Sequence, residues 1–457
     1  MLCDTTAETP DSVYELCPIE GLATGFNIPF SLLYTDGPGH SGSPRAAKRV
    51  DDDWLRVAFD QLTELYPLSL GRRVQLADRE VIVVSAGDRL KQRFFSHAEP
   101  TVAVAELDRE KFRRDRWPPA LDALLSARTA DSDSLISAAV VRLADGFLVT
   151  LSVSHLITDG VSVVTLLQQW AALAATGAAA VPVDYDHPGF WKRLTAHPAD
   201  VHPYVAYTAE QGYGPLDGIR ARLGTLHKTG SLDGSQALGM RVFHVSGDSI
   251  ARLAARHNTD PGERPLHGAQ LMYALLWQRY VAAVLGARPT ETGPHDAIFL
   301  NLMHNVRGAA GAEHYVGNAV GTVFVPSTIE ELRSLSVSAL ARKIKPFVNS
   351  VTPGATVDLY TASADTSSEF VLKATLKMST PEACLTISNI SRLPFLEIDF
   401  GLGAPMAVLC GMYPIENMAI WLPNRSGGVD IHFGLKDDIY AALRADEVLA
   451  EYVQFTD

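Results

Sequence analysis

A short motif in the first half of the chain carries the residues best suited to acid–base chemistry. Residues 154–160 read SHLITDG, with His155 directly after a strand-like segment and Asp159-Gly160 directly before a helix-like one. Histidine exchanges a proton more readily at neutral pH than other side chains, so His155 is a candidate general base. Asp159 could orient the imidazole or fix the turn, and Gly160 permits backbone angles that other residues resist. A packed histidine before an ordinary turn is the alternative interpretation.

A second short motif, DFGLG at residues 399–403, lies in the second half of the chain. By itself it predicts a strand that ends in a glycine-rich turn before Pro405. A protein-kinase interpretation is excluded, because no HRD loop precedes the motif and no glycine-rich loop with a VAIK-type lysine lies near the start. The chain also has no GxSxG motif for a nucleophilic serine, which favours direct group transfer over a covalent enzyme intermediate.

Strand-like and helix-like segments alternate around these motifs. Apolar residues at helical spacing predict a helix over residues 53–66 that ends at Pro67. Residues 147–155 alternate apolar and polar side chains, which predicts a half-buried strand that ends at His155, followed by a helix from about Ser162. In the second half we expect a strand at 240–246, a helix at 268–285, further strands between 296 and 435, and a final helix at 444–454.

A change of composition divides the chain into halves. Residues 176–240 are rich in proline and glycine, which is typical of a long connection with some short helices. We therefore expect an N-terminal lobe over residues 1–190, a crossover connection over 191–240 and a C-terminal lobe over 241–457. No segment of 20–50 residues repeats, which argues against solenoids and propellers.

The composition narrows the possible functions. The 457 residues include 39 basic and 52 acidic side chains, and the resulting formal charge of −13 makes nucleic acid an unsuitable partner. The four cysteines form no CxxC pair, so a zinc ribbon is excluded and we expect no metal. The acidic start and the short apolar segments predict neither a secretory signal nor a membrane span. We therefore expect a cytoplasmic protein.

Together, the two motifs resemble those of the BAHD acyltransferases, which transfer acyl groups from coenzyme A to alcohols or amines. The family pattern has HxxxD, here at His155, and DFGxG in the second half of the chain. Further segments resemble the family in the same order, namely LYPLSLGRRV (65–74), LMYALLWQRY (271–280), NVRGAAGAEHYVGNAVG (305–321) and ISNISRLPFLEIDFGLGAP (387–405). The chain is similar to the fungal and microbial branch of the family, which includes trichothecene O-acetyltransferases.

The resemblance implies a fold and a reaction. The implied fold is α/β with two lobes, each a mixed β-sheet flanked by helices, and an active-site channel between the lobes. His155 would be the general base that takes a proton from an acceptor hydroxyl or amine while the acceptor attacks the thioester of acyl-CoA. Acetyl-CoA is the favoured co-substrate, the acceptor would be a small specialised metabolite, and we expect a monomer.

The resemblance also implies supporting roles for residues around His155. Asp159 would point away from the substrate and pair with an arginine, for which Arg307 is the candidate. Gly160, Asp399 and Gly401 are implied to be structural.

Contacts to coenzyme A are implied at two places. Ser388 and Asn389, ahead of the DFGLG motif, would lie near the pantetheine arm and the thioester. The basic run RKIK would place Arg342, Lys343 and Lys345 near the phosphates, unless it is an ordinary solvated helix face.

Three features bear on how closely the chain follows the family. Leu402 replaces the usual tryptophan of DFGWG, and RPLHGAQ (264–270) lacks the Ser/Thr and Asp common before the Trp-containing helix. Ser154 stands where the related condensation domains of peptide synthetases have a second histidine, and together with DFGLG it favours the stand-alone acyltransferase. Alternatives nevertheless stay open. One alternative is acyl transfer from a carrier-protein thioester, as in those domains. The others are a non-catalytic member of the fold and a different reaction that uses His155 as its base.

Overall fold

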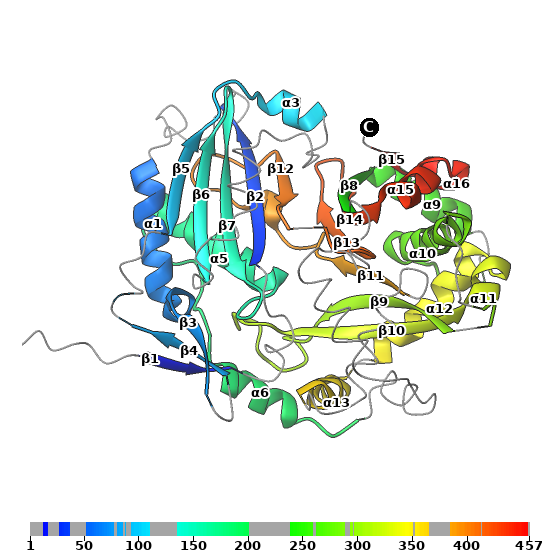
Figure 1. Cartoon of the computed structure of the whole chain (residues 1–457), viewed down its shortest axis with the longest axis horizontal. Coiled ribbons are helices and arrows are strands. Elements are labelled where there is room, and N and C mark those ends of the chain that lie inside the picture. The colour runs from blue at the N-terminus through cyan, green and yellow to red at the C-terminus, as the bar shows by residue number, and fades with distance from the viewer. Residues whose placement is uncertain are drawn as a thin grey trace, which may run out of the picture.

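Two large β-sheets, one built mainly from each half of the chain, organise the structure (Figure 1). The computed structural model describes residues 12–16, 27–36, 52–76, 80–85, 87, 93–109, 135–200, 238–258, 262–287, 293–295, 297–350, 352–364, 384–412 and 414–455. Within these residues the strands form sheets of five, seven and three strands. This mixed α/β architecture is the one that the sequence predicts.

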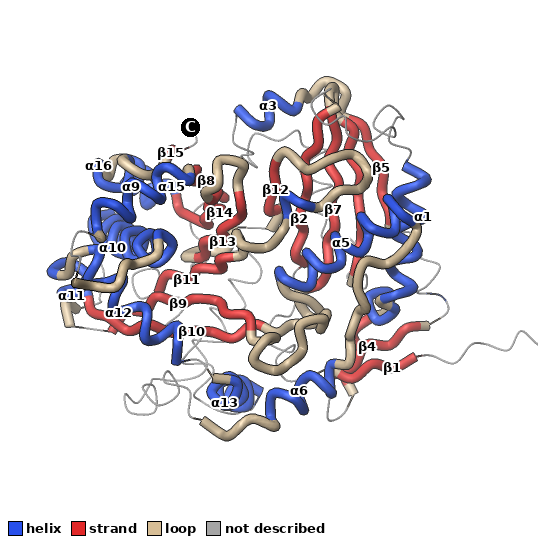
Figure 2. The backbone as a smooth tube through the Cα atoms, turned by 180° about the vertical axis from the view of Figure 1, so that it is seen from behind, coloured by secondary structure: helices blue, strands red, loops and turns tan. Residues whose placement is uncertain are grey.

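The five-stranded sheet carries the strand that leads into His155. Its order is β12-β2-β7-β6-β5, with β2 (Asn27–Thr35), β5 (Phe94–Ala98), β6 (Ile136–Arg142), β7 (Gly146–Ser154) and β12 (Ala407–Cys410). Helices α1 (Asp52–Leu65) and α5 (Gly160–Thr176) pack on one face, and α3 (Val104–Arg109) packs on the other. Figure 2, which views the molecule from behind, shows α5 lying against this sheet.

Strand β7 is buried along its whole length, so the expectation of a half-buried strand was wrong. Phe147 and Val149 face the core under α1 and α5, whereas Leu148 faces the smaller core under α3. The polar residues of the strand, Thr150, Ser152 and Ser154, carry only short hydroxyl groups; those of Thr150 and Ser154 have hydrogen-bond partners, whereas Ser152 Oγ has none among the described residues. Thr150 Oγ1, for example, lies 2.7 Å from Ser31 Oγ on the neighbouring β2. Satisfied hydroxyls of this kind are tolerated in a core, so alternation did not indicate exposure here.

Within the described part of the chain, helices cover one face of the seven-stranded sheet. Its order is β10-β9-β11-β13-β14-β8-β15, with β8 (Leu238–Val245), β9 (Ala297–Asn305), β10 (Val320–Thr328), β11 (Cys384–Asn389), β13 (Met418–Pro423), β14 (Val429–Lys436) and β15 (Gln454–Phe455). The covering helices are α9 (Gly247–His257), α10 (Gly268–Ala287), α11 (Ile329–Ser334), α12 (Val337–Ser350) and α15 (Asp437–Arg444). On the other face, Ile420 and Leu422 of β13 join the core of the five-stranded sheet.

A segment of the second half of the chain enters the first sheet. Strand β12 pairs antiparallel with β2. Just before it, after the short 3-10 helix η5 (Phe395–Glu397), Phe400 packs edge-on against Trp170 of α5 with ring centroids 5.1 Å apart. We still propose lobe boundaries at residues 190 and 240. The structure adds an excursion, in which Phe400 and β12 of the second half of the chain pack into the first sheet and its core.

The crossover begins between the two large sheets. Helices α6 (His187–Thr195) and α13 (Pro353–Ala364) lie near each other at the lower end of Figure 1. Beside them is the small sheet of β1 (Ser12–Glu15), β4 (Glu80–Val84) and β3 (Arg72–Gln75). Strand β3 directly follows the 3-10 helix η3 (Pro67–Leu70). Residues 201–237 of the expected crossover lie outside the described residues.

The helices at 53–66 and 268–285 are confirmed as α1 and α10, but the single final helix expected at 444–454 was wrong. Helix α15 ends at Arg444, and a separate short helix, α16 (Glu447–Ala450), follows. The Asp446 carboxylate accepts a hydrogen bond from Leu449 N at 2.8 Å, so Asp446 starts a new helix instead of continuing the old one. Among the described helices, none has the length and apolarity to cross a membrane.

The packing of the excursion generates a stability prediction. Phe400 is fully buried in the first core although it comes from the second half of the chain. We expect Phe400→Ala to lower the free energy of unfolding by about 3–5 kcal/mol, because it leaves a cavity against Trp170. Equilibrium urea denaturation measures this change. The matched control is Phe95→Ala on edge strand β5, where the side chain is 38% exposed, and equal losses in the two variants would contradict the packing argument.

Candidate active site

His155 lies on the turn that connects the end of β7 to the start of α5. The turn is fixed by its own hydrogen bonds: Thr158 Oγ1 donates to Ser154 O at 2.8 Å, and Leu156 N donates to Ser154 Oγ at 3.3 Å. Strand β7 holds the near end of the turn, since Ser154 pairs with Asn27 on β2. A central strand, an internally bonded turn and a long helix therefore position the histidine.

The imidazole of His155 is half-buried and faces the second half of the chain. Asn318 Nδ2 lies 3.4 Å from His155 Nδ1 and 3.4 Å from the His155 carbonyl oxygen. Burial lowers the pKa of His155 below its usual value, and the backbone groups of His155 and Thr158 and the Asp159 charge oppose this only in part. A lowered pKa keeps the imidazole neutral at physiological pH, as a general base requires.

Asp159 does not face the imidazole, because both of its oxygens are used elsewhere. Arg307 Nη1 donates to Oδ2 at 2.8 Å and Arg307 Nη2 donates to Oδ1 at 2.9 Å, so the pair is bidentate. Both side chains are 2% exposed. The carboxylate also accepts from Ser162 N at the start of α5 and from Ala319 N beside β10, each at 2.9 Å. The pairing of Asp159 with Arg307 that we expected is thus present.

The guanidinium of Arg307 also donates hydrogen bonds to the loop that connects β9 to β10. Its Nε donates to Tyr315 O at 2.7 Å, and Nη2 donates to Gly317 O and to Ser162 Oγ, both at 2.7 Å. This loop carries Asn318, so the same cation fixes both the start of α5 and the neighbour of His155. Burial alone would raise the pKa of Asp159. The charge of Arg307 and the hydrogen bonds that the carboxylate accepts from Arg307, Ser162 N and Ala319 N lower the pKa below its usual value.

Gly160 plays a simpler part than its residue type indicates. It is the first residue of α5 and is not among the glycines with positive φ, so the expectation of a backbone angle that other residues resist was wrong. An added Cβ would lie 3.4 Å and 3.5 Å from the side chain of Ile390. The contact instead shows that the end of β11 lies beside the start of α5.

The DFGLG motif forms a tight loop around its own carboxylate. Asp399 Oδ1 accepts hydrogen bonds from the backbone nitrogens of Gly401, Leu402 and Gly403, each at 2.7 Å. Gly401 and Gly403 have φ angles of +85° and +91°, which favour glycine. Phe400 lies in the core, and Asp399 is bonded to the backbone of its own loop; a structural role for Asp399 and Gly401 stays a prediction.

The residues expected near the pantetheine arm lie at the end of β11. The Asn389 amide nitrogen donates to Tyr273 Oη at 2.6 Å, and its oxygen accepts from Ser391 N and Ser391 Oγ, so both ends of the amide have partners. Ser388 points to the opposite face from Ile387, which belongs to the helix-covered core, and is therefore on the face that looks toward the first sheet.

The basic run lies on α12, and two of its three charges have acidic partners. Arg342 pairs with Glu263, and Lys343 Nζ lies 2.5 Å from Glu331 Oε2. Lys345 is half-buried and has no ion pair with any described residue. Within the described ranges, no group of three or more His, Cys, Asp or Glu side chains has a metal-binding arrangement.

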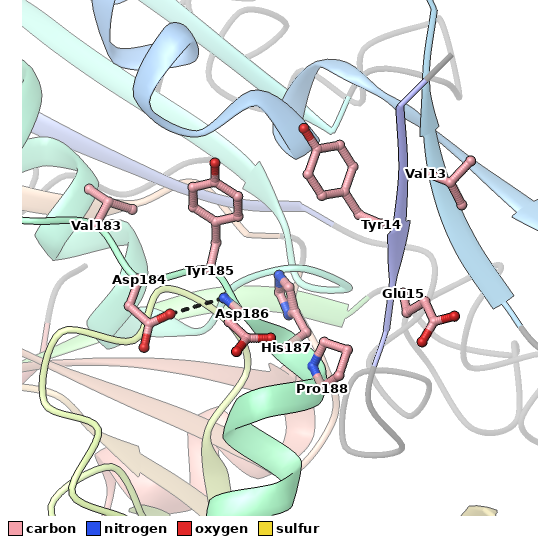
Figure 3. Close-up of a pocket in the computed structure, with 9 residues that line it drawn as sticks. All are labelled: Val13, Tyr14, Glu15, Val183, Asp184, Tyr185, Asp186, His187 and Pro188. Carbon is pink, nitrogen blue, oxygen red and sulfur yellow. Dashed lines mark hydrogen bonds between the residues drawn. The ribbon is translucent and has the colours of Figure 1, made fainter. Parts of the chain in front are cut away.

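A cavity of about 510 Å³ lies between β1 and the start of α6, and none of the predicted site residues lines it (Figure 3). Its lining residues include Tyr14, Tyr185 and Asp184. Asp184 is already engaged, because its carboxylate accepts from Asp186 N at 3.0 Å and from Arg193 Nη2 at 2.9 Å.

Sequence reasoning missed several residues that complete the site, namely Asn318, Ser162 and Tyr315. Asn318 and Tyr315 belong to the YVGN segment that contributed to the resemblance, so a signal existed without an assigned role. Ser162 follows the HxxxDG motif by two positions, and no local pattern indicates that its hydroxyl contacts both Arg307 and Gly317.

The buried pair predicts a large stability effect. We expect Asp159→Asn to lower the free energy of unfolding by about 3–5 kcal/mol, because it leaves the Arg307 charge buried without its counter-ion. The folded-state pKa of Asp159 is lowered, so the ionised carboxylate stabilises the protein above its unfolded pKa of about 4, and this contribution is lost as the pH falls through the folded-state value. The gap between wild type and variant should be constant at neutral pH and should narrow in acid.

Urea denaturation at several pH values measures this gap. Asp53→Asn is the matched control, because Asp53 pairs with Arg56 on the surface and its side chain is 79% exposed. That change should cost less than about 1 kcal/mol. If both variants lost the same stability, the pair at Asp159 would not be the anchor that its geometry indicates.

Several known proteins are similar to this chain in sequence. Putrescine hydroxycinnamoyltransferase of Oryza sativa subsp. japonica is 25% identical over 308 residues, which are 65% of this chain and 66% of that protein, just under two thirds of its length. Vinorine synthase of Rauvolfia serpentina is 21% identical over 451 residues, covering 96% of this chain and 93% of that protein.

Solved structures share the fold. The structure of F. sporotrichioides TRI101 complexed with coenzyme A and T-2 matches with a TM-score of 0.71 at 15% identity, over 98% of this chain and all of that one. The model of the Transferase family matches residues 60–446 of the chain. The chain therefore belongs to the Transferase family, the BAHD acyltransferases that its two motifs resemble.

Proposed function

We propose that this protein transfers an acyl group from acyl-CoA to a hydroxyl or amine of a small specialised metabolite, with His155 as the general base. The observation that carries the proposal is the position of His155. His155 is half-buried on a turn that the Asp159–Arg307 ion pair holds in place, and the carboxylate of Asp159 is turned away from the imidazole. Membership of the BAHD family supports an acyl transfer reaction.

The proposed reaction is a direct attack without an acyl-enzyme. For Nε2 to act as the base, the neutral imidazole must carry its proton on Nδ1, and the backbone groups of His155 and Thr158 are the hydrogen-bond partners that favour this arrangement. Nε2 takes the proton from the acceptor O–H or N–H while the acceptor oxygen or nitrogen forms a bond to the thioester carbonyl carbon. The tetrahedral intermediate then collapses, the carbon–sulfur bond breaks, and the imidazolium returns the proton to the leaving thiolate. A positioned base of this kind contributes about 10²–10⁴-fold to the rate.

The co-substrate proposal depends on two regions. Ser388 has its side chain on the face of β11 that looks toward the first sheet, and we infer that it lies near the thioester. Asn389 holds this strand end through Tyr273. On α12, Lys345 is the candidate for a phosphate contact. Arg342 and Lys343 would have to exchange their acidic partners, Glu263 and Glu331, to bind phosphate.

Acetyl is the acyl group that we favour, and a hydroxyl is the acceptor that we favour. The fold similarity to TRI101, whose solved structure contains coenzyme A and T-2, supports a coenzyme-A-dependent reaction on a specialised metabolite. Because putrescine hydroxycinnamoyltransferase and agmatine coumaroyltransferase are among the relatives, amines also remain candidate acceptors.

Replacement of the base tests the proposal. We expect His155→Ala to lower the acceptor-dependent release of thiol from acetyl-CoA by about 10²–10⁴-fold, because the acceptor then lacks a base. A panel of alcohols and amines, assayed with a thiol reagent, measures the release, and calorimetry measures coenzyme A binding.

The matched control is His97→Ala on edge strand β5, where the histidine contacts Glu99 near the surface and should not affect turnover. Full turnover by a folded His155→Ala variant would contradict the proposed role. Absence of coenzyme A binding by the wild-type protein would favour a carrier-protein thioester as the donor.

The burial of His155 predicts the pH dependence of the reaction. Its pKa is lowered, so the neutral base persists at pH values below the usual histidine value of about 6.5. We expect kcat/KM for the acceptor to stay level as the pH falls through 6.5 and to decline only below it, as the imidazole becomes protonated, because kcat/KM reports ionisations of the free enzyme. Substrate concentrations well below KM for the acceptor and constant ionic strength are needed for the measurement. An acid limb centred at or above 6.5 would contradict a lowered pKa of the catalytic imidazole.

A further inference from the structure

A buried tyrosine far from His155 in the sequence reaches the turn that carries it. Tyr66, directly after α1, is 0% exposed, and its hydroxyl donates a hydrogen bond to the carbonyl oxygen of Ile157 at 2.7 Å. Ile157 is itself fully buried and lies two residues after His155 on the same turn. The short distance is typical of a strong O–H···O hydrogen bond.

The same hydroxyl lies beside the loop that carries Asn318. Tyr66 Oη is 3.4 Å from the carbonyl oxygen of Val316, two residues before Asn318. The hydroxyl therefore stands between the turn that carries His155 and the loop that carries its neighbour. Arg307 joins these same two segments through Asp159 and Gly317, so Tyr66 provides a second link between them.

The ring of Tyr66 is held independently of its hydroxyl. Its backbone nitrogen donates to Leu62 O at the end of α1, and its carbonyl oxygen accepts from Ser69 N and Ser69 Oγ. The ring packs edge-on against Tyr185, with centroids 5.8 Å apart, and Tyr185 lines the cavity of Figure 3. Since main chain and ring are both fixed, the hydroxyl is a preset donor aimed at the His155 turn.

We propose that Tyr66 is a positioning residue for the acyl transfer reaction, which acts by fixing the Ile157 carbonyl and with it the orientation of His155. The inference rests on the proposed function, in which His155 is the base. Proton transfer requires the imidazole nitrogen within hydrogen-bond reach of the acceptor, and a displacement of about 1 Å can reduce the rate by up to 10²-fold. The Tyr66 hydroxyl prevents such a displacement by holding the turn at Ile157, whereas Asp159 holds it through Arg307.

Tyr66→Phe tests the proposal, because it removes the hydroxyl and keeps the ring. We expect kcat per folded molecule to fall about tenfold or more, whereas KM for acetyl-CoA and the dissociation constant of coenzyme A should stay within about twofold of wild type. Steady-state thiol release gives kcat and KM, calorimetry gives coenzyme A binding, and near-UV circular dichroism gives the folded fraction at the assay temperature.

Tyr34→Phe is the matched control. Tyr34 is also buried in the first core, and its hydroxyl donates to a backbone carbonyl, that of Ile398, at 3.0 Å. A purely structural role predicts that both variants lose stability and keep kcat per folded molecule, and this result would overturn the proposal. Equal losses of kcat in both variants would overturn it as well.

His155→Ala, assayed in parallel, separates this inference from the proposed function. If His155→Ala keeps full turnover, the assignment of the base fails and Tyr66 has no base to position. If His155→Ala is inactive while Tyr66→Phe keeps wild-type kcat, only the positioning role fails. Loss of kcat in both His155→Ala and Tyr66→Phe, with Tyr34→Phe unaffected, is the result that we expect.

Discussion

The ion pair between Asp159 and Arg307 is the interaction on which the rest of the site depends. It joins residues 148 positions apart, and it connects the start of α5 in the first half of the chain to the β9–β10 loop in the second. Burying both charges is costly, so the pair is stable only because further hydrogen bonds complete it. Ser162, Tyr315, Gly317 and Ala319 supply these bonds. A shift of α5 relative to the β9–β10 loop would break several of these hydrogen bonds together. The ion pair is therefore held in a single arrangement.

This arrangement has a chemical consequence for His155. In a Ser-His-Asp triad, a carboxylate hydrogen-bonds the imidazole and stabilises its protonated form. Here the two oxygens of Asp159 are engaged by Arg307 and by backbone nitrogens, so the carboxylate acts on His155 only through space. Burial then dominates and lowers the pKa of His155. A neutral imidazole suits the proposed reaction, in which a proton is taken from the acceptor and soon given to a thiolate, because neither transfer requires a long-lived imidazolium.

The fold was predictable from the sequence where the signal is local, and the site was predictable only in part. The amphipathic spacing in α1 and the long apolar helix α10 follow from side-chain periodicity. The break between α15 and α16 depends on one carboxylate at Asp446, which local apolar spacing does not indicate. His155 was found from its motif, and Arg307 only through the family resemblance. Asn318 and Tyr66 act through contacts with residues 163 and 91 positions away, respectively, and nothing in their immediate sequence indicates those partners.

The excursion of the second half of the chain into the first sheet explains how the turn around His155 can be rigid without being enclosed. Phe400 and β12 are packed in the first core, and Ile420 and Leu422 reach that core from the second sheet. These contacts join the two halves on one side, while α6 contacts the β9–β10 loop through Phe190, whose ring stacks on Tyr315 at a centroid distance of 4.1 Å. The Asp159–Arg307 pair and the turn of His155 lie between these two attachments. Because apolar packing on either side resists separation of the halves, the imidazole can remain half-exposed to a substrate while its backbone stays fixed.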